Sequence, residues 1–326
     1  MRLRARTIAL LSALVPVLLA PAAQAQAPYP SKPIRIIVGF PPGGGLDFTS
    51  RLIAPYLSES LGQPVVVENK PGAAGVLAHG ELARSAPDGY TLMVGNIGPL
   101  ALAPSMMDKR PYDPVKDFTA LGQVLATYFV AAIPATLPAD SLKGFIDWAK
   151  RNEGKANFAS GGNGSITHLN GELLNQLGGI RMLHVPYKGS APAVTDLIAG
   201  QTHILIDVGS VLKPQVQAGR LKAIAVTSPT RDADLPNVQT AREAGFPDLE
   251  TSGWQGLVGP AGMPREVVQK IHGALRATLA KPDVRERLAK AGTPVMERSP
   301  DEFAAFIKAE NERWLPLIKS SGARIQ

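Results

Sequence analysis

The chain has 326 residues, of which 45% are hydrophobic and 19% charged, a composition typical of a globular protein of about two domains and unlike that of a disordered chain or a coiled coil. It contains no cysteine, which excludes disulfides, thiolate metal sites and cysteine nucleophiles. The formal net charge is +7, but no run of Lys and Arg is interleaved with aromatic residues, so binding to nucleic acid is not expected.

The N-terminal segment 1–25 has the features of a cleavable secretory signal. Three arginines precede the apolar run Ile8–Leu19, and Ala23-Gln24-Ala25 forms a small-x-small cleavage site. The alternative, a membrane anchor, is disfavoured because the run spans about 12 residues and a membrane-spanning helix needs about 20. Removal of the segment lowers the count of basic residues from 34 to 31 against 27 acidic ones, which leaves a net charge of +4. We therefore expect an exported protein with a mildly cationic surface suited to small anions.

The first part of the mature chain alternates short apolar runs with helical patterns. Strands are predicted at Ile34–Val38, Val65–Val67 and Tyr90–Val94. A helix ending at Leu61 separates the first two strands, and a short helix near Val76–Ser85 precedes the third. This order indicates an α/β fold, with parallel strands covered by helices.

The middle of the chain repeats the pattern, and the last third is predicted to be mostly helical. Ser141 is expected to cap a helix that ends near Arg151. Further strands are predicted at Asn157–Ser160, Met182–Val185, Ile204–Asp207 and Ala223–Val226, with helices ending near Leu177, Ala199 and Gly219. The last predicted helices are a short one capped by Thr240 and Glu243 and ending at Gly245, one from Pro264 to about Ala280, and a long one capped by Ser299 and Glu302. The helical tail is expected to pack back on the first lobe.

Two glycine-rich turns follow predicted strands and precede predicted helices, at Gly43–Gly45 and at Gly161–Gly164. The start of a helix presents unpaired backbone N–H groups and the positive end of the helix dipole, and glycine lets a ligand approach the main chain. Each turn therefore predicts an anion site, although glycines also serve simply to make tight turns. The polar residues Asn163, Ser165 and Thr167 beside the second turn favour a site.

Motifs for catalysis, nucleotides and metals are missing from the sequence. No GK[ST] follows the first turn, Thr167 stands where a dinucleotide fingerprint needs its third glycine, and no serine lies in G-x-S-x-G. The five histidines form no zinc-binding pattern, so we expect no metal, no cofactor and no catalytic residue. His168 is interpreted as a packed or hydrogen-bonded residue. Asp207 is either a site residue or a cap, and Asp47 is expected to cap the first long helix, with contact to a ligand as the other interpretation.

Six separated stretches between Tyr29 and Ala323 carry a resemblance to a known family through their order and spacing. They are YPSKPIRIIVGFPPGGGLD (Tyr29–Asp47), LGQPVVVENKPGAAG (Leu61–Gly75), APDGYTL (Ala86–Leu92), PYDPVKDF (Pro111–Phe118), GGNGSITHLNGELL (Gly161–Leu174) and HVPYKGSAPAVTDLIAGQ (His184–Gln201). With them, the chain resembles the Bug-type periplasmic solute receptors, the substrate-binding components of tripartite tricarboxylate transporters.

The resemblance implies a two-lobed α/β fold of the class II periplasmic-binding-protein type. Each lobe would hold a mostly parallel sheet flanked by helices, with a hinge between the lobes. Lobe 1 would comprise residues 28–127 and 249–326, and lobe 2 residues 128–248. It further implies a periplasmic, non-catalytic monomer that closes on a small organic carboxylate and works with membrane transporter subunits or a sensor.

The resemblance also implies which residues contact the ligand. Carried over by position, these are Phe40, Pro42, Gly43, Gly44, Gly45, Asp47 and Asn96 in lobe 1, and Gly162, Asn163, Gly164, Ser165, His168 and Asp207 in lobe 2. The chain departs from the family where Asn96 and Leu100 replace a frequent threonine and histidine, and where Val208 replaces a common asparagine. These changes predict a ligand whose distal group is less polar, such as a longer dicarboxylate or an aromatic acid.

Three other functions are kept as alternatives. A receptor of this kind can signal to a sensor rather than feed a transporter, and the sequence does not separate the two roles. An α/β hydrolase or transferase would need a nucleophile with a base in reach, which the sequence does not show. A cation receptor would need a cleft rich in Asp and Glu, whereas the two glycine-rich turns contain no acid apart from Asp47.

Overall fold

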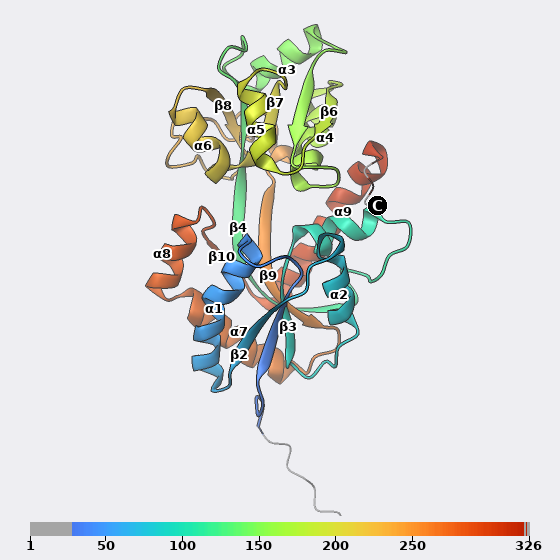
Figure 1. Ribbon diagram of the computed structural model, residues 1–326, viewed down its shortest axis with the longest axis vertical. Helices are drawn as coiled ribbons and strands as arrows, with labels where there is room; N and C mark the ends of the chain where they lie inside the picture. The colour runs from blue at the N-terminus through green and yellow to red at the C-terminus, as the bar shows by residue number, and fades with distance from the viewer. Residues whose placement is uncertain (1–27, 323, 325–326) are drawn as a thin grey trace, which may run out of the picture.

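The computed structural model describes residues 28–322 and 324, so the expected signal segment 1–25 lies outside the described residues. Figure 1 shows two groups of helices and strands, which are connected by the long strand β4 (Phe118–Pro134) and by β9 (Ser252–Pro260). This two-lobed α/β arrangement agrees with the fold expected from the resemblance. No helix in the described part of the chain is long and apolar enough to cross a membrane.

The sheet of the first group starts as predicted and then changes direction. Strand β1 (Ile34–Val38) lies between β2 (Val65–Asn69) and β3 (Thr91–Asn96), and both pairs are parallel. Beyond β3, strand β9 pairs with β3 and with β4 in antiparallel fashion, and β10 (Val295–Arg298) pairs antiparallel with β4. The sheet is therefore mixed, because the two strands that run between the groups oppose the parallel ones.

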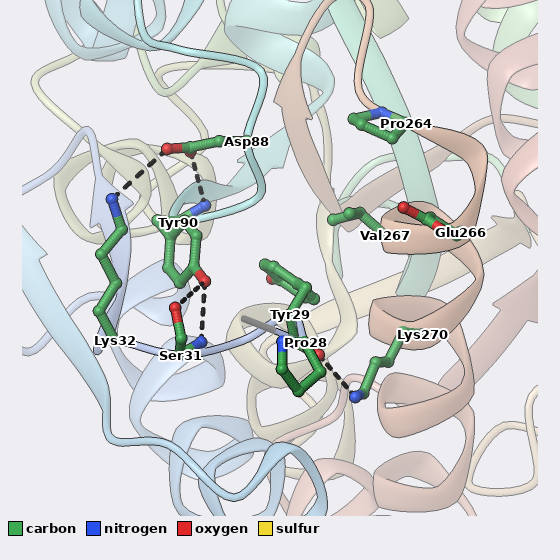
Figure 2. A pocket seen from close by; sticks show the side chains of 10 residues that line it. All are labelled: Pro28, Tyr29, Ser31, Lys32, Asp88, Tyr90, Pro264, Glu266, Val267 and Lys270. Atoms are coloured by element: carbon green, nitrogen blue, oxygen red, sulfur yellow. Dashed lines mark hydrogen bonds and ion pairs between the residues drawn. The ribbon is translucent and has the colours of Figure 1, made fainter. Parts of the chain in front are cut away.

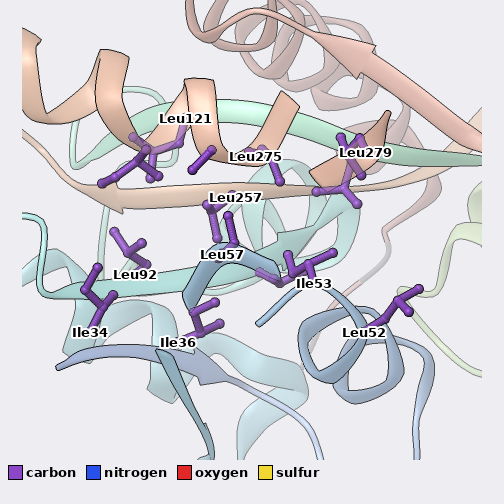
Figure 3. Packing of buried hydrophobic residues seen from close by; sticks show 14 of the residues in the cluster. Ile34, Ile36, Leu52, Ile53, Leu57, Leu92, Leu121, Leu257, Leu275 and Leu279 are labelled. Atoms are coloured by element: carbon purple, nitrogen blue, oxygen red, sulfur yellow. The ribbon is translucent and has the colours of Figure 1, made fainter. Parts of the chain in front are cut away.

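Helices cover both faces of this sheet because its strands alternate apolar side chains to either side. On one face, Ile36 packs with Leu57 of α1 (Gly45–Leu61) and Leu275 of α7 (Arg265–Leu279), and α8 (Pro282–Lys290) joins them (Figure 3). On the other face, Ile37 belongs to a cluster with α2 (Val76–Ala83), α9 (Pro300–Ser321) and the short helices Gly98–Leu102 and Ala103–Met106. Short 3-10 helices also occur at Ala73–Gly75 and Pro247–Leu249. The expected packing of the C-terminal helix on the first lobe is thereby confirmed.

The second group repeats the same construction. Strand β5 (Asn157–Ser160) is parallel to β6 (Leu183–Pro186) and β7 (Ile204–Val208), whereas β7 and β8 (Leu221–Val226) run antiparallel to β4. The helices α3 (Leu142–Arg151) and α4 (Ile166–Gly178) pack on one face, and α5 (Ser190–Ile198) and α6 (Gly209–Gln217) on the other. Strand β4 changes partners between Tyr128, which pairs with Ser252 of β9, and Phe129, which pairs with Val208 of β7.

The prediction for the last third of the chain is wrong in two respects. Strands β9 and β10 lie where no strand was predicted, and the fold uses the glycines of β9 for close packing. A Cβ at Gly256 would overlap the Phe303 ring, and one at Gly259 would overlap the Met263 sulfur. The helix expected before Gly245 is a turn, even though Thr240 and Glu243 form both hydrogen bonds of the expected cap. Gly245, at φ 91°, redirects the chain before a second helical turn can form.

Candidate functional site

The first glycine-rich turn leads into α1 without a side-chain cap. Gly44 is the N-cap residue, in an extended conformation at φ −80°, and no described side chain accepts a hydrogen bond from the first turn of the helix at this cap. Residues 41–45 are all exposed. The N–H groups at the start of α1 are therefore available to an anion, and the helix dipole adds partial positive charge.

Asp47 holds this turn in place from inside the protein. It is 4% exposed, and its Oδ2 accepts a hydrogen bond from the Gly43 N–H at 2.9 Å. Its Oδ1 accepts from Arg51 Nε and from Asn69 Nδ2, each at 2.9 Å. The hydrogen bond from Arg51 and that from the Gly43 N–H lower the pKa of Asp47 to about 2. Asp47 is thus not the N-cap of α1 as expected, because it is the third helical residue and binds the N–H that precedes the cap.

The second turn is fixed by a compact set of hydrogen bonds. Gly162 and Gly164 have φ values of 129° and 74°, which favour glycine. Ser165 caps α4 by accepting from the His168 N–H at 3.2 Å, and its hydroxyl donates to the Gly162 carbonyl at 2.7 Å. Thr167 Oγ1 accepts from the Gly161 N–H at 2.8 Å. The shape of the second turn is therefore determined by hydrogen bonds within the protein.

Two stacked imidazoles lie behind this second turn. The rings of His168 and His184 are 3.8 Å apart between centroids at an angle of 9°, and Phe158 stacks on His184. The Gly164 N–H donates to His168 Nδ1 at 3.1 Å, so that nitrogen is unprotonated. Burial, and to a smaller extent the neighbouring His168, lowers the pKa of His184 to about 4. His168 is buried and hydrogen-bonded, as interpreted from the sequence; its contact with a ligand stays a prediction.

A cavity of about 270 Å³ lies between the two groups of elements. Its lining comes from the ends of β3 and β7, the middle of β4, the start of β9 and the first residues of α4 and α6: Asn96, Ile97, Leu125, Thr127, Phe129, Ile166, Val208, Ser210, Gly253, Trp254, Gln255, Gly292 and Thr293. Both glycine-rich turns adjoin it. Ile166 is the first residue of α4, and a Cβ on Gly45 would lie 3.7 Å from Nε2 of the lining residue Gln255.

The remaining predicted site residues have different places around this cavity. Asn96 lines it directly, whereas Asp207 is buried at the end of β7 behind the lining residue Val208. Burial raises the pKa of Asp207, and hydrogen bonds from the Ser190 side chain and the Val208 N–H partly offset the rise. The ring of Phe40 lies against Gly75, so its side chain is directed into the first lobe.

Leu100 does not face the cavity, contrary to the expectation from its place in the sequence. Its side chain is 0% exposed and belongs to the core of the first group, because the chain after β3 turns inward as the π-helix Gly98–Leu102. Position 100 therefore does not line the cavity and says nothing directly about the distal end of a ligand. The changes at Asn96 and Val208 keep their bearing on the ligand, since both residues line the cavity.

Several lining residues were not found by sequence reasoning. Thr127 and Gln255 belong to β4 and β9, the strands that the sequence pattern did not indicate, and Thr293 lies in the loop before β10. No sequence motif surrounds these residues. The pairing of β4 with β9 brings Thr127 and Gln255 to the cavity, and the loop before β10 brings Thr293 there. Ser210, at the start of α6, is the exception: it follows a predicted strand closely, and the rule that ligands bind at the carboxyl ends of strands could have indicated it.

A second hollow, of about 740 Å³, lies at the opposite edge of the first group (Figure 2). Its lining includes Tyr29 and Tyr90, which precede β1 and β3, so it lies at the amino ends of these strands, whereas their carboxyl ends lead to the first glycine-rich turn and to Asn96. Lys270 Nζ donates to the Tyr29 carbonyl at 2.6 Å, and Lys32 Nζ lies 4.3 Å from the Tyr90 ring centroid. None of the predicted ligand contacts lines this hollow. Among the described residues, no group of three or more His, Cys, Asp or Glu is placed to hold a metal ion.

The fold is that of the periplasmic binding proteins, as comparison with solved structures shows. The periplasmic binding protein BugD is 34% identical, with a TM-score of 0.71 over 91% of this chain and 100% of its own. MatC from Rhodopseudomonas palustris with bound malate is 33% identical, with a TM-score of 0.72 over 89% of this chain and 100% of its own. Rpa4515 of R. palustris with adipate is 32% identical, with a TM-score of 0.73 over 91% of this chain and 99% of its own.

The family comparison agrees with this class. The tripartite tricarboxylate transporter family receptor matches residues 49–323, which is most of the chain. The chain therefore belongs to this family of receptors, as the sequence resemblance implied.

Proposed function

We propose that the protein is an exported, non-catalytic receptor that captures a small organic carboxylate between its lobes for a tripartite tricarboxylate-type transporter. The observation that carries the proposal is the convergence of two helix starts on one cavity. The N-terminus of α1 comes from the first group and that of α4 from the second, and both adjoin the same 270 Å³ space. A carboxylate held where the two helix starts adjoin this space would accept hydrogen bonds from backbone N–H groups of both lobes.

The free energy of binding would come from preorganised donors rather than from a cationic side chain. Hydrogen bonds to a charged group contribute about 1.5–3 kcal/mol each, and a helix N-terminus adds about 0.3–1 kcal/mol for a nearby anion. Asp47 and the bonds around Ser165 fix the two turns before the ligand arrives, so little ordering entropy is lost on binding. Because the ligand would bridge the two lobes, it would shift the population towards a closed form that a membrane partner recognises.

The ligand would be a dicarboxylate or an aromatic acid. Two solved relatives are described with malate and adipate, which supports a small organic acid as the ligand class. The same proposal includes the thirteen predicted contacts and the monomeric state. It also includes the lobe boundaries, at 28–127 with 249–326 for lobe 1 and at 128–248 for lobe 2. The signal segment 1–25, the periplasmic location and the absence of a nucleic-acid partner belong to it as well. A sensor in place of the transporter stays the alternative partner.

The site argues against the two other functions. A hydrolase or transferase would need a nucleophile paired with a base, but Ser165 uses its hydroxyl to cap α4 and to bind the Gly162 carbonyl. The hydroxyl of Ser160, which lies within 2.6 Å of His184 Nε2, sits beneath the second turn and is fully buried. A cation receptor would need acidic ligands, and the cavity lining contains none.

Native mass spectrometry of the protein purified from its host tests the proposal directly. We expect a co-purified acid, and titration calorimetry against C4–C8 dicarboxylates and aromatic acids should then give tight one-to-one binding. Gly44→Val, which adds a branched side chain at the exposed N-cap of α1, should weaken binding of every acid, whereas Gly273→Val at an exposed position on α7 should not. Tight binding of a cation or of a neutral solute, with no affinity for any acid, would contradict the proposal.

A further inference from the structure

We infer that the cavity receives the uncharged, hydrogen-bonding part of a monocarboxylate, so that among organic acids the receptor prefers a hydroxy-substituted monocarboxylate to a dicarboxylate. The inference rests on the proposed carboxylate receptor, because it concerns the part of the ligand beyond the carboxylate held at the glycine-rich turns, and it argues against the dicarboxylate among the proposed ligands.

The first support is the charge of the lining. None of the described residues that line the cavity carries a formal charge. Phe129, Trp254 and Leu125 are almost completely buried and form an apolar wall. A second carboxylate entering this space would lose its hydration without meeting a cationic side chain, which is unfavourable. Asp207, buried behind Val208, would add repulsion between like charges.

The second support is a pair of side-chain amides in this uncharged space. Asn96 on β3 and Gln255 on β9 are direct partners in the register of the two strands, and both line the cavity. Asn96 Oδ1 and Gln255 Oε1 are buried, and neither has a hydrogen-bond partner among the described residues. A buried acceptor without a donor destabilises a structure, so a ligand that brings an O–H or N–H group is favoured over one that brings a methylene.

The position of Gln255 connects the amide pair with the carboxylate site. Its Nε2 lies beside Gly45 at the start of α1, and its Oε1 is the buried acceptor. Asn96 Oδ1 lies beside Gly98, where a Cβ would come within 3.5 Å of it. The terminal torsion of an amide side chain is broad, so a modest rotation turns either oxygen towards a ligand in the cavity. One ligand can therefore reach the helix start with its carboxylate and the amide pair with its other end.

The size of the cavity limits the ligand. An apolar cavity of about 150 Å³ already accommodates a benzene molecule. The cavity here measures about 270 Å³, so a ring or a chain of about six carbons fits with room for one polar substituent. The ligand class is therefore a monocarboxylic acid with an apolar body and a hydroxyl or amide group at its far end.

Three acids with the same six-carbon chain test the inference by titration calorimetry: hexanoate, 6-hydroxyhexanoate and adipate. We expect 6-hydroxyhexanoate to bind about tenfold more tightly than either of the others. Gln255→Leu should abolish the preference for 6-hydroxyhexanoate over hexanoate, and Asn96→Ala should reduce it. Gln269→Leu, the same change at an exposed position on α7, should leave all three affinities unchanged. A cooperative thermal unfolding transition is required of each variant, as the check that it is folded.

The outcomes separate this inference from the proposed function. Tighter binding of adipate than of 6-hydroxyhexanoate, or equal binding of hexanoate and 6-hydroxyhexanoate, overturns the inference and leaves a carboxylate receptor. An unchanged preference for the hydroxyl group in folded Gln255→Leu overturns the role of the amide pair. If none of these acids binds, nor any in the wider panel of dicarboxylates and aromatic acids, the proposed function itself is rejected.

Discussion

Asp47 shows how a charged residue can shape an anion site through the turn that it holds in place. Its carboxylate lies close to the proposed ligand carboxylate, which by itself would repel the ligand. Hydrogen bonds from Gly43, Arg51 and Asn69 compensate the negative charge of the carboxylate. They also hold the turn in the shape that exposes the N–H groups of α1. Asp47 therefore acts as a positioning residue for the first turn.

Asp47→Asn should destabilise the fold and weaken acid binding, in a manner that depends on pH. The folded protein holds the pKa of Asp47 at about 2, below its usual value near 4. The charged form thus contributes stability above pH 4, and this contribution is lost as the pH falls towards 2. Thermal unfolding should show a deficit of about 1 kcal/mol for the variant at pH 5 and almost none near pH 2. Asp147→Asn, at an exposed position on α3, is the control; a deficit that stayed constant with pH would contradict this account.

The buried histidines predict a second loss of stability, at less acidic pH. Burial lowers the pKa values of His79 and His184 to about 4 each, whereas an unfolded histidine titrates near 6.5. Between these values the unfolded chain binds protons that the folded protein does not, so stability should fall as the pH drops from 6.5 to 4. His79→Asn should flatten this part of the pH profile in denaturant unfolding. A wild-type stability that is level between pH 6.5 and 4 would contradict the burial of neutral imidazoles.

At the scale of elements, sequence patterns identified the strands and helices whose signals are local. Ile34–Val38 and Asn157–Ser160 are strands with the predicted bounds, and the predicted cap at Ser299 is present with both of its hydrogen bonds. Strands β4 and β9 were missed for physical reasons. Their apolar residues do not alternate with polar ones because both faces are covered. Their glycines are required by close contacts with helices that are distant in the sequence. The glycine-rich turns of the site were therefore predictable, but the cavity wall between them was not.

Two glycine-to-alanine substitutions should have opposite effects on stability. A Cβ at Gly256 in β9 would overlap the Phe303 ring and lie 3.0 Å from the Gly122 carbonyl oxygen, so Gly256→Ala should destabilise the fold by about 1–3 kcal/mol. Gly273 lies within α7 with nothing within 4 Å of its Cβ position, so Gly273→Ala should stabilise it by about 0.5–1 kcal/mol. Urea unfolding measures both. Destabilisation of similar size by the two changes would show that helix propensity and steric contact do not explain these glycines.

At the scale of the whole molecule, the site follows from where the parallel strands end. Strands β1, β3, β5 and β7 all lead, at their carboxyl ends, into residues proposed to contact the ligand. Open α/β sheets bind ligands at that edge because the loops and helix starts that follow the strands meet there. In this chain two such edges, one from each lobe, adjoin a common cavity whose wall is formed by β4 and β9. Affinity would then depend on the relative position of the lobes.

A disulfide across the cavity should test whether binding needs the lobes to move. Ser210 belongs to α6 of the second group, and Gly292 lies in the loop before β10 of the first. A Cβ on Gly292 would lie 3.6 Å from the Ser210 Cβ, within the range of about 3.5–4.5 Å that disulfides need. The chain has no cysteine of its own, so no native thiol competes when the double variant Ser210→Cys with Gly292→Cys is oxidised at low protein concentration.

If the lobes close on the ligand, the oxidised double variant should bind its acid at least about tenfold more weakly than the reduced form, because the bond holds the lobes at their present separation. Reduction should restore the affinity, and each single variant should be insensitive to the reductant. Because Gly292 has φ 72°, the cysteine there carries some backbone strain in both redox forms, so strain does not contribute to the difference between them. Equal affinities with and without the bond would mean that the cavity binds its ligand in the arrangement seen here, as a preformed site.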